Sequence, residues 1–404
     1  MPLPSVEAEE WRYSRIAELD LGRYSSVPPQ LGALDVPSAA GDVLAGLGPL
    51  AGFVVLLDGH VIHSEVDDGP WGSGVRFGSS HDDAVGAETV LGDAEPDPSD
   101  LFVAWNDALS VEPVTLDVPA GVTVEHPFAV ISYVGSDRSA TFPRISVRVG
   151  ADAEASLVEV HLSADLEALV VPVTDLSVGP AARLRHAVLQ DVGPKVWHLG
   201  TLGATVDRDA TVTVSAAALG GDYARLRLDC RLEGIGATGN LSSVYLGDGT
   251  QMLDLRTFQS HNAANTTSNL LFKGGVADSA HSVYTGLIRI APGAKGSNAF
   301  QTNRNIKLSD DAWAESVPNL EIENNDVHCS HASTVGPVDS DQRFYLESRG
   351  VPTNVAERLV VGGFFDEVLD DFAVPALAGQ VAARLDATLD RALGQAAAEQ
   401  GDAS

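Results

Sequence analysis

The sequence predicts a mainly β protein, built on a β-helix, with an N-terminal α/β segment and a C-terminal helical segment. One observation is a recurring unit in the middle of the chain, where apolar and polar residues alternate on both sides of a Gly-, Asp- or Asn-rich corner. Repeats of about 20–50 residues are typical of solenoids, whose coils bury their apolar sides only when they stack. A second observation is a leucine-rich periodicity near the C-terminus, which indicates helix.

The corners of the repeat are marked by small alanine-centred turns at nearly even intervals. Successive intervals are 29, 28, 27, 27 and 30 residues. This spacing assigns residues 112–342 to a β-helix or β-solenoid core. The residues alone leave one alternative open, which is a β-sandwich with regularly spaced hairpins. The turn alanines are Ala153, Ala182, Ala210, Ala237, Ala264 and Ala294.

Residues 1–111 are expected to form a segment of mixed α/β character. The stretch 53–63, FVVLLDGHVIH, predicts two strands joined by a turn at Asp58-Gly59. Residues 101–110, LFVAWNDALS, predict a short helix that leads into the first coil. Trp11 offers an aromatic anchor near the start of the chain.

Residues 343–404 are expected to form a helical domain. Asn354, with Glu357 three positions later, suits a capping box before a helix over 355–369. Pro375 suits the first turn of a second helix. An apolar residue at every fourth position then gives this second helix one buried face. The members of this stripe are Leu377, Val381, Leu385, Leu389 and Leu393.

The charge of the chain is strongly acidic and restricts its partners. The net charge is −31, from 56 acidic and 25 basic residues. Only four of the basic residues are lysine. Concentrated salt screens the self-repulsion of such a surface, so a halophilic source is our preferred explanation, and a merely acidic protein is the alternative. Because the sequence has no basic stripe, we expect neither a nucleic-acid partner nor an anionic membrane.

The sequence predicts a cytoplasmic protein. The first residues have no basic region before an apolar run, and no stretch of about 18 apolar residues occurs. The two cysteines, Cys230 and Cys329, suit free thiols in a reducing cytosol better than a disulfide. The segment 291–297, APGAKGS, lacks the frame of a phosphate-binding loop, so we expect this chain to bind no nucleotide.

Cys329 and His331 are the residues that most strongly suggest chemistry. Two positions apart on a strand, a thiol and an imidazole project from the same face, whereas His328 would project from the opposite one. Both groups are ligands for iron and for iron–sulfur clusters. Two ligands do not complete a site, so the others must come from elsewhere on this chain or from a partner. The structural alternative is a small buried cysteine beside a hydrogen-bonded core histidine.

The segment 318–350, PNLEIENNDVHCSHASTVGPVDSDQRFYLESRG, resembles the signature of the SufB/SufD family of iron–sulfur cluster assembly scaffolds. Members of this family usually read CSHGATVG where this chain reads CSHASTVG. At 9–16, EEWRYSRI resembles the element that opens SufD-like chains. At 300–309, FQTNRNIKLS has Asn303 near the place where SufB-like chains carry a second cysteine. The chain is therefore most similar to the SufD branch.

The resemblance implies a right-handed parallel β-helix and a scaffold that is not itself an enzyme. It implies a SufB-like partner, a SufC-like ATPase docked on 343–404, and a transient iron–sulfur cluster shared with SufB. His331, with Cys329, would bind metal at the junction. Cys230, in LDCRLEG, resembles the sulfur acceptor of SufB-like chains, although SufD-like chains do not require it and a core cysteine is the alternative. The predicted partner-binding residues are Phe344, Tyr345, Arg349, Leu359, Phe364 and Phe365.

Two other functions stay open on the sequence. One is a SufB-like scaffold that acts alone or as a homodimer and holds a cluster without a partner. The other is a β-solenoid carbohydrate-active enzyme, which needs clustered carboxylates or basic residues along one face of the solenoid. The Ala- and Gly-rich corners of this repeat lack such a cluster.

Overall fold

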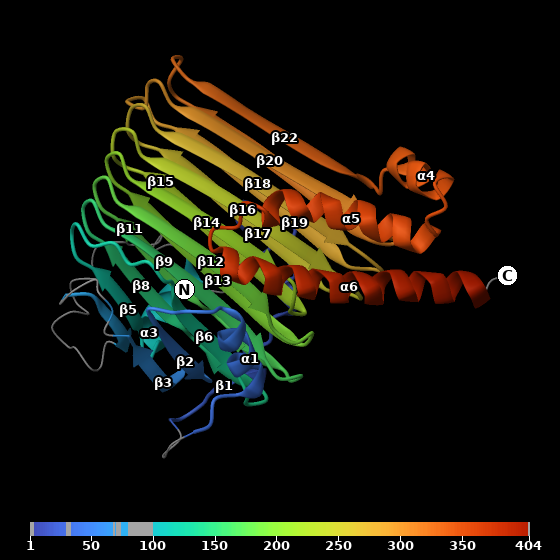
Figure 1. The fold of residues 1–404 in the computed structure, drawn as a ribbon, viewed down its shortest axis with the longest axis horizontal. Coiled ribbons are helices and arrows are strands. Elements are labelled where there is room, and N and C mark those ends of the chain that lie inside the picture. Colours follow the sequence, from blue (N-terminus) through green and yellow to red (C-terminus); the bar gives the residue numbers. More distant parts are fainter. Residues whose placement is uncertain (1–3, 30–33, 68, 70–73, 80–99, 403–404) are drawn as a thin grey trace.

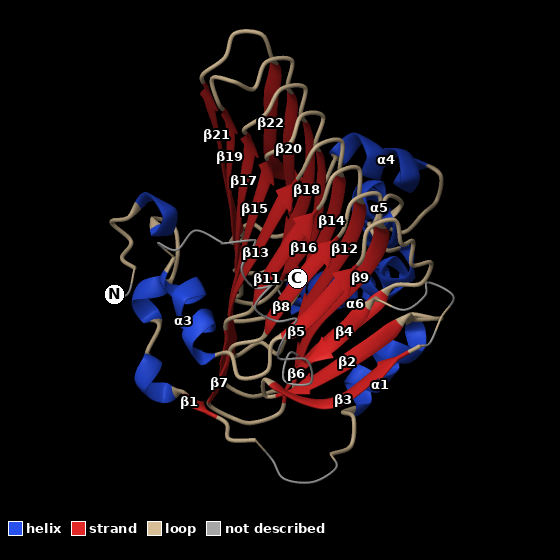
Figure 2. Ribbon diagram, turned by 90° about the vertical axis from the view of Figure 1, so that its left-hand side faces the viewer, coloured by secondary structure: helices blue, strands red, loops and turns tan. Residues whose placement is uncertain are grey.

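The chain forms a β-solenoid whose two sheets face each other (Figures 1 and 2). Side chains from both sheets fill the space between them, and this packed interior is called the bore below. The structure is a computed structural model that describes residues 4–29, 34–67, 69, 74–79 and 100–402. Within these residues, successive core strands alternate between the sheets and stack in parallel, giving about eight turns. The predicted mainly β fold with a β-helix core and helical ends is confirmed, and the β-sandwich alternative is excluded.

The first sheet contains 12 of the described strands, most of them on one continuous path. In order along the path they are β21 (Trp313–Ile322), β19 (His281–Ile290), β17 (Met252–His261), β15 (Tyr223–Leu232), β13 (Val196–Val206), β11 (Val173–Val178), β8 (Arg144–Val149), β5 (Val114–Val118) and β4 (Arg76–Ser79). Beside the path lie β1 (Ser25–Ser26), β7 (Ser139–Thr141) and β10 (Ala168–Val170).

The second sheet contains 10 of the described strands. In order they are β22 (His328–Pro337), β20 (Asn298–Lys307), β18 (Thr267–Val276), β16 (Thr238–Gly247), β14 (Thr211–Ala218), β12 (Arg183–Asp191), β9 (Glu154–Ser163), β6 (Phe128–Val134), β2 (Gly52–Leu57) and β3 (His60–Val66). The predicted hairpin over 53–63 is the β2–β3 pair. Its turn residues, Asp58 and Gly59, have φ of 51° and 88°, as a tight hairpin turn requires.

At each of the six predicted corners a left-handed residue is followed by a small buried residue. At the last two of these corners the buried residue is Thr266 or Ser297, and the predicted turn alanines, Ala264 and Ala294, lie earlier in the same turns. The hydroxyl groups of Thr266 and Ser297 are 2.7 Å apart and hydrogen-bond each other, so a polar pair replaces alanine there. The alanines that occupy the buried corner position as predicted are Ala153, Ala182, Ala210 and Ala237.

The C-terminal helices cover the outer face of the second sheet (Figure 1). α5 (Thr353–Leu369) and α6 (Pro375–Asp402) pack there with α1 (Ser38–Gly46), and α4 (Ser340–Ser348) follows β22. The predicted apolar stripe of α6 is buried from Leu377 to Leu389, and the side chain of Leu393 lies outside the described ones. The capping box predicted at Asn354 is wrong. α5 begins at Thr353 after Pro352, and no side chain caps its first turn.

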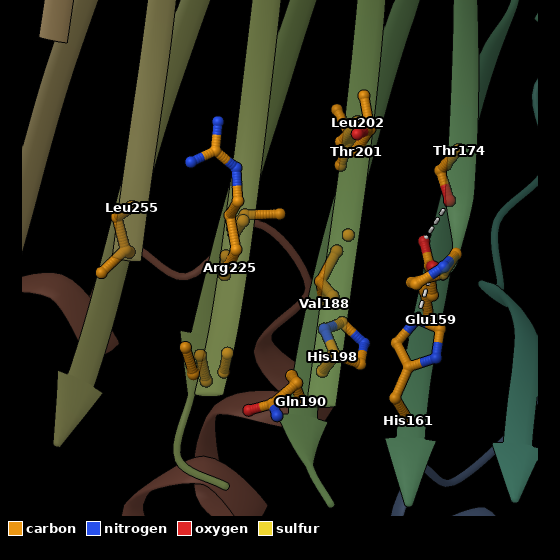
Figure 3. A pocket seen from close by; sticks show the side chains of 17 residues that line it. Glu159, His161, Thr174, Val188, Gln190, His198, Thr201, Leu202, Arg225 and Leu255 are labelled. Atoms are coloured by element: carbon orange, nitrogen blue, oxygen red, sulfur yellow. Dashed lines mark hydrogen bonds and ion pairs between the residues drawn. The ribbon is translucent and has the colours of Figure 1, made fainter. Parts of the chain in front are cut away.

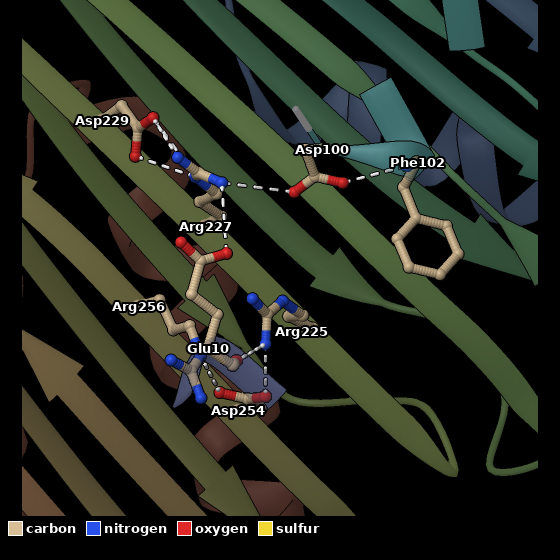
Figure 4. Close-up of polar contacts among 8 residues, drawn as sticks. All are labelled: Glu10, Asp100, Phe102, Arg225, Arg227, Asp229, Asp254 and Arg256. Carbon is tan, nitrogen blue, oxygen red and sulfur yellow. Dashed lines mark hydrogen bonds and ion pairs between the residues drawn. The ribbon is translucent and has the colours of Figure 1, made fainter. Parts of the chain in front are cut away.

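The N-terminal segment covers the outer face of the first sheet (Figure 2). It contains the short 3₁₀ helices η1 (Glu9–Trp11), η2 (Ile16–Glu18) and η3 (Leu21–Arg23), and α3 (Leu101–Leu109) packs beside it as the sequence predicts. The Trp11 ring is buried and stacks on the guanidinium of Arg225 at 3.7 Å. Arg227 ion-pairs with Asp100, whose side chain caps α3 (Figure 4).

The bore is filled by apolar side chains in some coils and by polar ones in others. Valine, leucine and alanine fill most of the N-terminal coils. In the C-terminal coils the hydroxyl of Tyr245 donates to Asn305 and accepts from Asn303, at 2.6 Å and 2.8 Å. Among the described residues, no helix has the length and apolar character needed to cross a membrane.

Candidate functional site

The C-terminal end of the solenoid leaves one edge of each sheet open. Within the described residues, β22 pairs with β20 alone and β21 pairs with β19 alone. An edge strand presents unpaired N–H and C=O groups, to which a strand of another chain can add. Apolar side chains are exposed here too, among them Ile322 and Val335. This end of the solenoid therefore has the features of a protein–protein contact surface.

Cys329 and His331 lie on β22, at this open edge. Their neighbours on β20 are Ala299 and Gln301, which are buried and face the bore. Strand alternation therefore directs both the thiol and the imidazole toward the mouth of the bore. Cys329 is half-buried against a small apolar cluster that contains Ile288 and Ala299, and burial raises the pKa of its thiol. His331 is exposed, which excludes the alternative of a core histidine.

The two side chains supply a soft sulfur donor and a nitrogen donor at the same mouth. Iron in proteins is bound by such donors, and a four-coordinate iron requires two more. Among the described residues, no group of three or more His, Cys, Asp or Glu side chains is arranged to hold a metal ion. Cys329 and His331 could therefore supply two of the four donors that such an iron needs, and a partner would have to supply the others.

Cys230 lies in a different environment, inside the bore on β15. Its side chain is completely buried, and burial raises the pKa of the thiol to about 12, with a smaller effect of Asp229 in the same direction. Arg231 lowers the pKa less than burial raises it. Arg225 and Arg227 alternate with Cys230 along the strand and so point to the outer face. A Cβ at Gly239 would lie 2.7 Å from the sulfur, so the bore is closely packed here.

Three of the six predicted partner-binding residues line a groove of about 1130 Å³ between β20, β22, α4 and α5. Tyr345, Leu359 and Phe364 line it. Phe344 projects from α4 with 69% of its surface exposed, and Arg349 stacks on the ring of Tyr345. The groove is therefore an accessible, partly apolar surface.

Phe365 points the other way and attaches α5 to the second sheet. It is 1% exposed and packs in the cluster between the helices and the sheet. Lys273, buried on β18, donates to the carbonyl of Phe364 at 2.6 Å and ion-pairs with Glu367. Sequence reasoning missed this lysine. Its signal was a lysine within the otherwise apolar run LLFKGGV, in a chain that has only four.

A second polar cluster, also missed, lies inside the bore around Glu159 and His161. The alternation E-x-H on one strand was a usable signal, because both side chains must share a face. Glu159 is hydrogen-bonded to His161 on β9 and to His186 on β12. The register between β9 and β12 sets Val188 opposite Glu159 and His186 opposite Leu157, so His186 reaches Glu159 from two residues along the strand. This register cannot be read from the spacing of either residue.

Known proteins resemble this chain over most of its length. A model described as "SUF system FeS cluster assembly, SufBD core domain" matches residues 132–364, more than half of the chain. An iron–sulfur cluster assembly SufBD family protein of Mycobacterium tuberculosis is 35% identical over 303 residues, 72% of each chain. The iron–sulfur cluster assembly protein SufD of Escherichia coli is 26% identical over 388 residues, which cover 95% of this chain and 88% of that protein. The SufD protein of Bacillus subtilis is 28% identical over 269 residues, or 66% and 62%. The chain therefore belongs to the SufBD family of iron–sulfur cluster assembly proteins and is SufD-like.

Proposed function

We propose that this chain is the SufD-like scaffold subunit of a cytoplasmic Suf complex. It pairs with a SufB-like subunit, binds a SufC-like ATPase and has no turnover of its own. The cluster is the cargo of the complex, formed transiently at the junction and then passed on. The observation that carries this proposal is the open strand edge at β22, where His331 and Cys329 face the mouth of the bore.

Pairing with the SufB-like subunit uses the open edges of β21 and β22. A second solenoid of the same family would offer similar edges, so that the sheets of the two subunits continue across the junction. The exposed apolar residues at this end, such as Ile322, would be removed from water by the contact. Main-chain hydrogen bonds would then fix the register, and with it the position of β22 against the partner.

His331 is the primary metal ligand in this proposal and Cys329 the secondary one. A neutral imidazole coordinates iron without losing a proton. A thiol must be deprotonated first, and burial raises the pKa of Cys329. The remaining donors come from the SufB-like subunit, so the cluster forms only in the complex. Cys230, with its raised pKa and closely packed position, has the properties of a core residue in this subunit.

The ATPase docks on the C-terminal domain, residues 343–404. The groove between α4 and α5 offers apolar side chains, and it also contains the charged pair Lys273 and Glu367. Buried aromatic anchors surrounded by charged groups are typical of protein–protein interfaces. Phe344 and Leu359 are the anchors that we expect to enter the ATPase.

The direct test is His331→Ala in the reconstituted complex, with His328→Ala as the matched control. His328 is exposed on the same strand, but alternation directs it to the opposite face. Cluster build-up is followed by absorbance under anaerobic conditions, and complex assembly by gel filtration. We expect His331→Ala to reduce build-up at least tenfold with assembly intact, and His328→Ala to do neither. Normal build-up with His331→Ala would remove this residue from the site.

A second candidate function is a SufB-like scaffold that works as a homodimer. It is favoured by the open edges themselves, since two copies of one edge strand can pair antiparallel. The chain is purified alone under anaerobic conditions, and its iron and sulfide contents are measured. A cluster retained without any partner favours the homodimer, and loss of iron from the isolated chain favours the SufD-like subunit.

A further inference from the structure

A small polar chamber lies inside the bore, several coils before the open end (Figure 3). Residues of β9, β11, β12 and β13, together with residues of β14, β15 and β17, line it, and its volume is about 30 Å³. Glu159 lies in its wall and accepts hydrogen bonds from Nε2 of His161 at 2.7 Å, Nε2 of His186 at 3.1 Å and Oγ1 of Thr174 at 2.8 Å. All of these side chains are buried. The Glu159 carboxylate therefore has three hydrogen-bond donors, whereas His161 and His186 each use only one of their two ring nitrogens.

Three imidazole nitrogens of the residues that line this chamber have no hydrogen-bond partner among the described residues. They are Nδ1 of His161 and both ring nitrogens of His198. The rings of His161 and His198 meet edge to face at 5.0 Å. Because the Glu159 carboxylate only accepts, His161 and His186 carry their protons on Nε2, and Nδ1 is an acceptor in the neutral ring. A neutral His198 presents one donor and one acceptor.

We propose that this chamber is an internal binding site for ordered water, which completes the hydrogen bonds of His161 and His198. A guest here must donate to Nδ1 of His161 and must both donate to and accept from His198. Water does all three, and the chamber exceeds the roughly 10–15 Å³ that one molecule occupies. An apolar guest would leave the three nitrogens unpaired in a buried place, which is costly. Much of the remaining lining, including Val188 and Leu202, is apolar, so we expect the water to lie beside the histidines.

Glu159, in the wall of the chamber, has its hydrogen bonds satisfied by protein side chains. Burial would raise the pKa of this carboxyl, but hydrogen bonds from His161 and His186 outweigh burial and hold the pKa well below its usual range. Because Nε2 of His161 is used by Glu159, Nδ1 of the same ring remains for the water.

The test is a crystal structure of the full chain, at a resolution that defines ordered water, with a second data set from a crystal under xenon pressure. Dry apolar cavities bind xenon, and hydrated polar ones do not. We expect density for water within hydrogen-bond distance of His198 and of Nδ1 of His161, and no xenon in the chamber. Xenon in the chamber, or an absence of water density there, would overturn the proposal. A metal peak in the anomalous map would overturn it in favour of a metal site.

A variant at His198 tests the same proposal in solution. His198→Phe keeps a ring of similar size and removes both nitrogens. If the chamber holds water, this change removes hydrogen-bond partners of the water, and Tm falls by more than for Leu202→Met, a nearly volume-conserving change in the same wall. If the chamber is dry, the change removes two unpaired nitrogens and Tm rises. A rise in Tm would contradict the water site.

Discussion

Thiol chemistry in this protein depends on where a cysteine lies along the solenoid. Cys230 fills the bore in the middle of the core, and Cys329 lies at its open mouth. Burial raises the pKa of both thiols, and that of Cys230 to about 12. The sequence predicted the alternation that brings Cys329 and His331 to one face. The sequence did not predict that Cys329 and His331 would be partly or fully exposed, because this depends on which coil is the last one of the solenoid.

The two thiols should react with iodoacetamide at very different rates. At pH 8 we expect Cys329 to be alkylated in the folded protein, because it is partly exposed. Cys230 should stay unmodified until the protein unfolds, since it is sealed and its thiol remains protonated. Peptide mass spectrometry after timed alkylation measures both, with a sample in guanidinium as the control in which both react. Similar native rates would contradict the closed bore.

Glu159 should make the stability of the protein sensitive to acid. Its folded pKa lies below the unfolded value of 4.5, so ionised Glu159 contributes stability that is fully present above pH 4.5 and is lost as the pH falls. Glu159→Gln should lower the free energy of unfolding by about 1–3 kcal/mol at pH 7. The difference in free energy of unfolding between this variant and the wild type should become smaller toward pH 3, because the contribution of ionised Glu159 is lost there. Urea unfolding at pH 7 and pH 3 measures these free energies. Glu125 is exposed, so Glu125→Gln is the control that should leave the free energy of unfolding unchanged at both pH values.

At the scale of elements, the repeat was predictable because its corners obey a backbone rule. The six predicted corners each contain a left-handed residue, which is Gly, Asn, Asp or, at residue 181, Ala. The prediction followed the turn alanines, and at the last two of these corners the residue after the left-handed one is Thr266 or Ser297. Asn265 and Gly296, the left-handed residues before them, keep the same place in the turn. The even spacing predicted the corners, but not the hydrogen bond between Glu159 and His186.

α5 packs one face against the second sheet and exposes another at the groove, where we propose that the ATPase binds. Single substitutions on the two faces should therefore have different effects. Leu359 is 54% exposed at the groove, whereas Val361 is completely buried against the sheet. Leu359→Asp should reduce co-purification of the ATPase at least tenfold and leave Tm unchanged, because a charge opposes docking without entering the core. Val361→Ala should lower the free energy of unfolding by about 1–2 kcal/mol. Pull-down and urea unfolding measure the two effects. Retention of the ATPase by Leu359→Asp would exclude this face of the helix.

At the scale of the whole molecule, the two ends of the solenoid differ, and this difference gives assembly a direction. At the N-terminal end the sheets finish in antiparallel strands, β3 on β2 and β4 on β5. At the C-terminal end both sheets finish in parallel strands with open edges. The outer faces are covered by the N-terminal segment on one side and by the C-terminal helices on the other. The sequence predicted the coils and the two flanking segments. It did not predict which end of the solenoid the flanking segments leave uncovered, because that depends on their path in three dimensions.

The net charge of −31 should make the stability of the whole protein rise with salt. Like charges on a compact surface repel one another, and unfolding separates them, so screening favours the folded state. The Debye length falls from about 10 Å at 0.1 M salt to about 3 Å at 1 M. We therefore expect Tm to rise steeply with KCl up to about 1 M and more slowly beyond it. Sucrose at matched osmolality, which is excluded from protein surfaces but screens no charge, is the control. If Tm rises equally in sucrose, or does not change with KCl, charge screening does not stabilise the protein. The stability would then come from the packing of the solenoid, and the acidic surface would not indicate adaptation to salt.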